Sequence, residues 1–497
     1  MKSKKTKVLF IFHYSEHINS YFNRSILQKI SEVYDIQILL PTSFKPYVPS
    51  EFQCITHYLD DNLFTCNKNK LYLCFEISAW RSRKKSVSFK YREKKISRPY
   101  TLMNLLKVLD SCIKSVLGSK KLNRLNEKEP TDFSSYKINS KNKAPLSLIR
   151  TGFWVLIRRA FIRIVSHNPF FVLIERFIFR SISVPSGIYS FIRNCNPSLI
   201  IYVSTGFEPM AYHIPKISDL LKKPSLMIAD NWDNLSSKTA MWVLPSFVAT
   251  WGPQSSIHAV NIQGFKPTRV FNIGTARFEN YFNIRRSKIK SQYNFRYVLF
   301  IGTSLYFNER ECLEILNQEI QSKPELYGKL KIVYRPHPFA QNKESASKFK
   351  DFDNVILDLQ IKSILGQSTK THPKIDYLPS LICNSELVIG GLSSVLIEAS
   401  ILGKKYLGLI HKEKFNLTSP YLIYKNYEHL KEIKMLPNLF LCEKLENLGK
   451  VFESVWNSKA IEQSKIDSNL AYFYELSEDS YVDKLTRVIN LGLITEN

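Results

Sequence analysis

Residues 387–394 read Leu387-Val388-Ile389-Gly390-Gly391-Leu392-Ser393-Ser394, and they indicate the fold of the second half of the chain. The first three residues predict a buried strand, and the glycines and serines open a helix that continues through Glu398. An earlier predicted strand ends in Tyr334-Arg335-Pro336-His337-Pro338. The carboxyl ends of parallel strands meet at one edge of a sheet, where open α/β folds bind ligands. The two segments therefore predict a ligand site at that edge.

Other apolar runs alternate with helical lengths along most of the chain. In the first half they cover residues 8–12, 36–40, 198–203, 225–229 and 247–250, and a helix is predicted over residues 20–33. In the second half they cover residues 297–301, 330–334, 354–357, 387–389 and 405–409. This rhythm predicts an α/β fold with two Rossmann-like, doubly wound parallel-sheet domains facing a cleft. We expect domains at 1–285 and 290–465 and a helical segment, 466–497, that crosses back to the first.

Composition limits the classes of protein to consider. With 497 residues, of which 44% are apolar and 13% aromatic, the chain can bury more than one core. Its 70 Lys and Arg against 43 Asp and Glu give a net charge of +27, which favours a polyanionic partner such as an acidic membrane surface, a phosphorylated substrate or nucleic acid. The eight cysteines are scattered without a C-x-x-C pair, as in a cytosolic protein with reduced thiols. We expect no disulfide, no metal and no cofactor.

Residues 64–190 interrupt the α/β rhythm and form a basic, partly helical insertion in the first domain. Nine Lys or Arg residues and one acid, Glu93, lie between Arg81 and Tyr100. Apolar blocks at 153–157 and 170–174 are punctuated by arginines, which suits helices in an anionic lipid interface. The alternatives are a solvated surface for the basic run and helices packed on their own domain. No segment is long enough to span a bilayer, so we expect a cytoplasmic protein, peripheral on the inner face of the plasma membrane.

Each candidate ligand residue of the second domain also has a structural explanation. Amide donors at the helix start bring Gly391, Ser393 and Ser394 toward an anion, although serine is an ordinary cap there. Glu398 either accepts from ribose hydroxyls or stabilises the first helical turn. The flanking prolines fix His337, which is predicted to donate to a phosphate or leaving group. The predicted donor site is completed by Gly302, Thr303 and Arg335.

The first domain supplies candidates for acid–base chemistry. The segment Asp230-Asn231-Trp232-Asp233-Asn234 follows a predicted strand and offers two carboxylates as bases, with Trp232 as a stacking surface for a sugar. The alternative is a turn held by side-chain to backbone hydrogen bonds. His13, His17 and Glu208 are further candidates, because they also follow predicted strands.

The order of motifs resembles that of bacterial surface-polysaccharide glycosyltransferases of the GT-B fold, over about residues 195–490. The motifs are Gly274-Thr275-Ala276-Arg277-Phe278-Glu279, Leu299-Phe300-Ile301-Gly302-Thr303, Arg335-Pro336-His337-Pro338, Ser393-Ser394 with Glu398, and Gly403-Lys404-Lys405. Similar families are teichoic-acid glycerophosphotransferases and capsule sialyl- or Kdo-type transferases. The resemblance implies that His337 and the paired serines contact a CMP- or CDP-activated donor without a metal. Gly391-Leu392 stands where glycerophosphotransferases have an acidic pattern, which favours a sugar donor.

These observations predict a glycosyltransferase of capsule or other cell-envelope polysaccharide biosynthesis, with a nucleotide-sugar donor and a glycan or lipid-linked acceptor. Asp230, Asp233 and His337 are the predicted catalytic residues, and His13, His17, Glu208 and Trp232 lie on the acceptor side. One alternative is a nucleotide-sugar 2-epimerase of the same architecture, which needs no acceptor. The other is a noncatalytic protein that binds a polyanion or membrane. The absence of a zinc-finger or RNP-type signature argues against nucleic acid.

Overall fold

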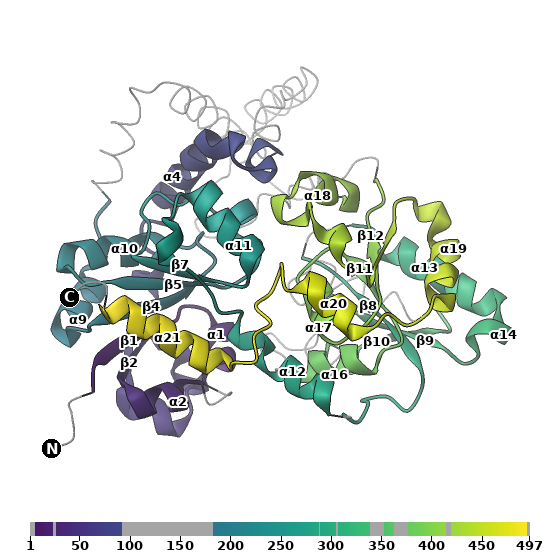
Figure 1. Cartoon of the computed structure of the whole chain (residues 1–497), viewed down its shortest axis with the longest axis horizontal. Helices are drawn as coiled ribbons and strands as arrows, with labels where there is room; N and C mark the ends of the chain where they lie inside the picture. Colours follow the sequence, from purple (N-terminus) through teal and green to yellow (C-terminus); the bar gives the residue numbers. More distant parts are fainter. Residues whose placement is uncertain are drawn as a thin grey trace, which may run out of the picture.

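A computed structural model describes residues 5–22, 26–91, 182–287, 289–304, 307–337, 352–361, 376–413 and 419–494. Within these ranges the strands form two parallel sheets, which lie side by side as the cores of two lobes (Figure 1). The predicted fold class, with two Rossmann-like parallel-sheet domains, is confirmed. The predicted domain boundaries stay predictions.

The N-terminal sheet has the strand order β3-β2-β1-β4-β5-β6-β7. The strands are β1 (Lys7–Ile11), β2 (Asp35–Pro41), β3 (Thr56–Leu59), β4 (Leu199–Ser204), β5 (Ser225–Ala229), β6 (Phe247–Thr250) and β7 (Val270–Asn272). Strand order reverses at β1, whose Val8 and Ile11 pair with Leu199 and Tyr202 of β4. The carboxyl ends of β1 and β4 therefore border the point where ligands bind in doubly wound sheets.

The C-terminal sheet repeats this plan with the order β10-β9-β8-β11-β12-β13. Its strands are β8 (Tyr297–Ile301), β9 (Lys331–Arg335), β10 (Val355–Leu357), β11 (Val388–Gly391), β12 (Tyr406–Leu409) and β13 (Leu439–Cys442). The reversal lies between β8 and β11, where Ile301 pairs with Gly390. On its other side Ile301 pairs with Arg335 of β9. Both sequence segments that predicted a ligand site thus end at this edge.

Alternation of side chains explains why the strands read as continuous apolar runs. In β1, Val8 and Phe10 pack into one core while Leu9 and Ile11 pack into the core on the opposite face. In β8, Val298 and Phe300 likewise pack into one core, while Leu299 and Ile301 pack into the core on the opposite face. Because helices cover both faces, the buried positions of these strands, Val8 to Ile11 and Tyr297 to Ile301, carry apolar or aromatic side chains.

Helices flank both sheets (Figure 1). Around the N-terminal sheet lie α1 (Ser15–Tyr21), α2 (Ile26–Val33), α3 (Asp61–Thr65), α4 (Lys68–Arg81), α9 (Ser186–Cys195), α10 (Met210–Leu221), α11 (Pro253–His258) and α21 (Tyr481–Ile494). Around the C-terminal sheet lie α12 (Glu279–Arg286), α13 (Glu309–Ser322), α14 (Pro324–Tyr327), α16 (Tyr377–Asn384), α17 (Val395–Ile401), α18 (Pro420–Asn426), α19 (Leu448–Asn457) and α20 (Gln463–Leu470). Instead of the predicted single helix over 20–33 there are two, α1 and α2, and α1 begins earlier.

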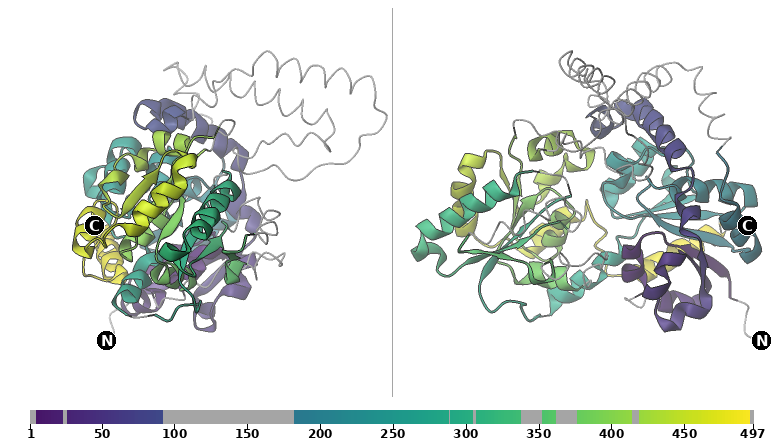
Figure 2. Two further views of the ribbon diagram at one scale, coloured as in Figure 1. Left: turned by 90° about the vertical axis from the view of Figure 1, so that its right-hand side faces the viewer. Right: turned by 180° about the vertical axis from the view of Figure 1, so that it is seen from behind.

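The C-terminal segment returns to the N-terminal lobe, and its last helix, α21, lies along that lobe (Figures 1 and 2). Between α20 and α21 the chain pairs with the loop after β6 and the start of α11, because Glu475 N donates to Trp251 O at 2.7 Å and Gln254 N donates to Tyr472 O at 2.9 Å. We call residues 471–480 the crossing strap. Beyond it, the Tyr481 hydroxyl lies 2.8 Å from that of Tyr21 in α1.

A second contact joins the two lobes around His429. His429 of the C-terminal lobe is 4% exposed, and its Nδ1 lies 3.0 Å from Ser237 Oγ of the N-terminal lobe. Gln254 Nε2 donates to His429 O at 3.1 Å. Ser88, which lies within the basic insertion, also accepts from Glu428 N through its hydroxyl at 2.8 Å.

Most of the basic insertion lies outside the described residues, including both apolar blocks and all of 92–181. In the described part of the chain, no helix has the length and hydropathy needed to cross a bilayer. Association with an anionic membrane surface stays a prediction.

Candidate functional site

Two histidine–carboxylate pairs lie at the carboxyl edge of the N-terminal sheet. His13 follows β1, and its Nε2 lies 3.1 Å from Glu208 Oε1 in the loop after the adjacent strand β4. Both side chains are 5% exposed. Burial alone raises the pKa of Glu208, but the charge and hydrogen bond of His13, with Ser204 and Thr205, lower it to about 2. Glu208 is therefore an anion at neutral pH.

The second pair joins α1 to the next strand of the sheet. His17 Nε2 lies 3.4 Å from Oδ1 of Asp230, which directly follows β5. Burial would raise the pKa of Asp230, but His17, and then the charges of Arg277 and Lys238, hold it well below its usual range. The Asp230 side chain remains 34% exposed, so this carboxylate is open to a ligand. The sequence predicted all four members of the two pairs but not their pairing.

Several polar atoms of this edge are buried without a hydrogen-bond partner among the described residues. They include His13 Nδ1, His17 Nδ1 and Asp233 Oδ1. Lys238 Nζ approaches Asp233 Oδ1 only to 3.5 Å. Buried polar atoms without partners are uncommon in folded proteins, and a group of them at a ligand-binding edge indicates a place for a polar ligand.

The structure corrects the role predicted for Trp232. Its side chain is 2% exposed and packs against the rings of His429 and Phe473, at centroid distances of 4.8 and 6.0 Å. It therefore joins the lobes and offers no open face to a sugar. The turn alternative is present as well, since Asn231 Oδ1 accepts from Trp232 N at 3.0 Å.

In the C-terminal lobe, the glycines of the predicted donor site allow close backbone approach. A Cβ on Gly390 would lie 2.4 Å from Ile301 O, and one on Gly391 would lie 2.9 Å from Thr303 Cγ2. Gly302 and Thr303 therefore sit directly beside the turn that holds the paired serines. Beneath them, Glu309 Oε1 accepts from Thr303 N at 3.2 Å.

The paired serines make local hydrogen bonds and are also partly exposed to solvent. Ser394 is the N-cap residue of α17 but makes no side-chain capping bond, and its hydroxyl donates to Glu398 Oε1 at 3.5 Å. Ser393 Oγ accepts from Val395 N at 3.4 Å. Both serines are half-buried. Glu398 is 3% exposed and accepts from the Tyr281 hydroxyl, which leaves its role toward a ribose untested.

His337 lies at the same edge, after β9. Because β8 separates β9 from β11, His337 and the paired serines are two strands apart, or roughly 10 Å. Burial lowers the pKa of His337 to about 4, and the charges of Arg335 and Lys238 add to this. The imidazole is therefore neutral at neutral pH.

The Arg335 side chain makes its bonds with residues that follow β10. Its guanidinium donates to Asp358 Oδ1 at 2.6 Å and to Gln360 Oε1 at 2.8 Å, and the side chain is 6% exposed. Asp358 is fully buried and also accepts from the Tyr377 hydroxyl at 2.8 Å. This ion pair gives Arg335 a structural role in place of the predicted donor contact, because its charge is already matched.

Arg277 belongs to the site although the sequence singled it out only as part of a family motif. It lies in the linker between the sheets, with its Nη2 4.0 Å from Glu398 Oε1, and its charge also reaches Asp230. Its proximity to one residue of each lobe depends on the fold, so local sequence could not show it.

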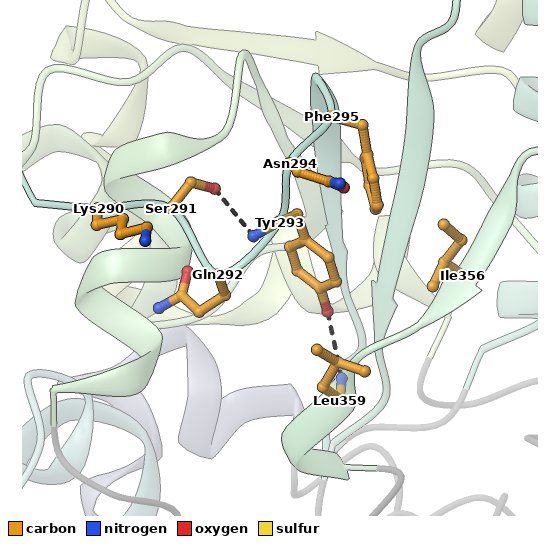
Figure 3. A pocket seen from close by; sticks show the side chains of 8 residues that line it. All are labelled: Lys290, Ser291, Gln292, Tyr293, Asn294, Phe295, Ile356 and Leu359. Atoms are coloured by element: carbon orange, nitrogen blue, oxygen red, sulfur yellow. Dashed lines mark hydrogen bonds between the residues drawn. The ribbon is translucent and has the colours of Figure 1, made fainter.

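A separate hollow of about 550 Å³ lies beside β10, away from these residues (Figure 3). Its walls are Lys290, Ser291, Gln292, Tyr293, Asn294, Phe295, Ile356 and Leu359. The Tyr293 hydroxyl accepts there from Leu359 N at 3.2 Å. Lys290 and Tyr293 are the two titratable residues of its lining.

Comparisons with known proteins agree with the fold. No protein-family model and no curated protein matches the sequence. A UDP-GlcNAc 2-epimerase from Methanocaldococcus jannaschii is 11% identical, with 98% of this chain and 100% of that chain covered and a TM-score of 0.48. The Neisseria meningitidis UDP-GlcNAc 2-epimerase bound to UDP-GlcNAc is 11% identical, with 99% and 100% covered and a TM-score of 0.43. A wall teichoic acid polymerase is 13% identical, with 60% and 73% covered and a TM-score of 0.39.

The two parallel sheets themselves show a GT-B-like two-domain fold, and likenesses at these identities and TM-scores do not confirm the families named from the motifs. The comparisons also correct the predicted function. Several of the similar structures are UDP-GlcNAc 2-epimerases, which stands against the prediction of a glycosyltransferase.

Proposed function

We propose that the protein is a nucleotide-sugar 2-epimerase. The observation that carries this proposal is the placement of two histidine–carboxylate pairs at the edge of one sheet, His13–Glu208 and His17–Asp230. Across from them, the Gly302-Thr303 and Gly391 to Ser394 turns border the reversal point of the second sheet. A nucleotide held at the second edge would present its sugar to the first.

Epimerisation at carbon 2 needs two acid–base events and no acceptor. When the diphosphate leaves carbon 1 with the C1–O electron pair, the C2–H electrons form a C1–C2 double bond and the proton passes to a base. Return of a proton to the other face of carbon 2, with return of the diphosphate to carbon 1, gives the epimer. A histidine paired with a carboxylate is suited to accept and donate protons near neutral pH. Two such pairs supply both events.

The two pairs differ in their access to a ligand. Glu208 is 5% exposed, so it is suited to orient His13, whose Nδ1 is buried without a hydrogen-bond partner among the described residues. Asp230 is 34% exposed and anionic, so it is the better candidate to meet the substrate directly. His337, neutral and at the second edge, is suited to donate a hydrogen bond to a phosphate oxygen.

The test is an incubation with UDP-GlcNAc alone in D₂O, followed by proton NMR. We expect exchange of the carbon 2 proton for deuterium and growth of the 2-epimer. The CMP-, CDP- and GDP-linked sugars follow as further arms. No exchange and no epimer with any of these nucleotide sugars would refute the proposal.

Asp230→Asn should lower the exchange rate by about 10²- to 10⁴-fold, because it removes the charge and the proton acceptor. The matched control is Asp219→Asn, the same change at an exposed position in α10. Undiminished exchange by Asp230→Asn would remove Asp230 from the reaction.

A further inference from the structure

Arg277 occupies the short linker that leads from the first sheet to the second. It lies in a 3-10 turn, Ala276–Phe278, between β7 and α12. Thr275 Oγ1 accepts from Arg277 N at 3.4 Å, and Gly274 precedes it with a φ of +76°. The turn is therefore fixed by local bonds, and the direction of the Arg277 side chain is set by its own packing.

Two aromatic rings hold the guanidinium in place. Its central carbon lies 5.2 Å from the Trp251 ring centroid and 5.0 Å from that of Phe278. Both rings are fully buried, and such stacking is favourable for a planar cation. The guanidinium is thus positioned before any ligand arrives.

Two nitrogens of this guanidinium have no hydrogen-bond partner in the described part of the chain. They are Nε and Nη2, and both are buried. Nη2 lies 4.0 Å from Glu398 Oε1, beyond hydrogen-bond distance, and that carboxylate already accepts from Tyr281 and Ser394. Buried donors of a charged group are costly when unpaired, so the geometry calls for an anionic acceptor.

The position of Arg277 indicates which anion its guanidinium would bind. On one side, Glu398 and Ser394 belong to the turn and first helical turn after β11. On the other side, the Arg277 charge helps to keep Asp230, after β5, ionised. A group bound by Arg277 therefore lies between the proposed nucleotide turn and the proposed proton acceptor.

We propose that Arg277 binds the phosphate that carries carbon 1 of the sugar, through two parallel N–H to oxygen bonds. The inference rests on the proposed function and deepens it. Arginine matches the geometry of phosphate oxygens in this way better than lysine does. As the C1–O bond breaks, its electron pair moves to the diphosphate, and the fixed guanidinium stabilises the added charge.

The experiment compares UDP with UMP, which lacks the outer phosphate, by isothermal titration calorimetry. For Arg277→Gln we expect UDP affinity to fall about 10- to 100-fold and UMP affinity to stay within about twofold, as for loss of charged hydrogen bonds. The matched control, Arg285→Gln, removes a nearby arginine of α12 that pairs with Asp467 at 2.6 Å. It should leave both affinities unchanged.

Arg277→Lys is the second variant, in case Arg277→Gln fails to fold. It keeps the charge, and it should lose at least about fivefold in UDP affinity but not in UMP affinity, since it offers no paired donors. Equal loss for UDP and UMP, or no loss for UDP, would overturn the inference.

The outcome separates this inference from the proposed function. A protein that binds UDP through Arg277 but exchanges no carbon 2 proton keeps the inference and loses the 2-epimerase. A protein that exchanges the proton while Arg277→Gln and Arg277→Lys bind UDP normally loses only the inference. Failure of the unchanged protein to bind UDP overturns the inference.

Discussion

Replacing Gly252 by Ala tests how the crossing strap is fastened to the N-terminal lobe. A Cβ on Gly252 would lie 2.7 Å from Tyr474 N and 2.8 Å from both C and O of Phe473. These are backbone atoms, so no side-chain rotation relieves the overlap. The φ of Gly252 is −179°, which any residue adopts, and the cost is therefore steric alone.

The magnitude follows from the same distances. Contact between carbon atoms is favourable near 3.5 Å, so the strap must move by roughly 0.7 Å. Overpacking of this kind costs about 1–3 kcal/mol. The movement also weakens the bonds from Gln254 N to Tyr472 O and from Glu475 N to Trp251 O, at about 1 kcal/mol each. We expect a total loss of roughly 3–5 kcal/mol in the free energy of unfolding.

The assay is urea unfolding followed by tryptophan fluorescence, since Trp251 and Trp232 both pack on the strap. The matched control is Gly492→Ala in α21, where the added Cβ meets Phe247 at 3.5 Å, an ordinary contact. That change should stabilise the protein by about 0.5–1 kcal/mol, because alanine favours a helix over glycine. Equal midpoints for Gly252→Ala and the unchanged protein would refute the described strap contact.

Two further predictions concern buried charges. Burial, followed by the charges of His258 and Lys238, lowers the pKa of His429 to about 4. The contribution of the neutral imidazole to stability is therefore complete above about pH 6.5. It is lost as pH falls from there toward 4, by at most about 3 kcal/mol. His429→Gln should reduce the slope of this part of the stability–pH curve in thermal unfolding, and an unaltered slope would contradict the assignment. Arg335→Met should cost about 3–5 kcal/mol because it leaves Asp358 buried and unpaired, while UDP affinity is kept. Unchanged stability with weaker UDP binding would return Arg335 to the predicted donor site.

The buried parts of the fold could be predicted from the sequence because both sheets are covered on both faces. Runs such as Leu199 to Val203 are apolar at every position, and this pattern with intervening helices indicates a parallel sheet. The strands that were missed, β3, β7 and β13, are short and partly exposed, so their apolar pattern is weak.

The site could be predicted in its residue types but not in its pairings. His13, Glu208, His17 and Asp230 each follow or flank a predicted strand, yet their pairing depends on β1, β4 and β5 being neighbours in the sheet. The direction of a side chain also could not be predicted from the local sequence. Trp232 turns into the contact between the lobes, since the strap supplies its apolar partner, Phe473.

The most direct test of the account is hydrogen–deuterium exchange with UDP and with UDP-GlcNAc, read by mass spectrometry of peptides. The account predicts that UDP slows exchange at residues 302–304 and 391–396. It predicts that UDP-GlcNAc also slows exchange at 12–17 and 205–208, because the sugar would reach the histidine–carboxylate pairs. Protection of the second lobe alone by both ligands, or of neither edge, would contradict a nucleotide sugar shared between the two sheets.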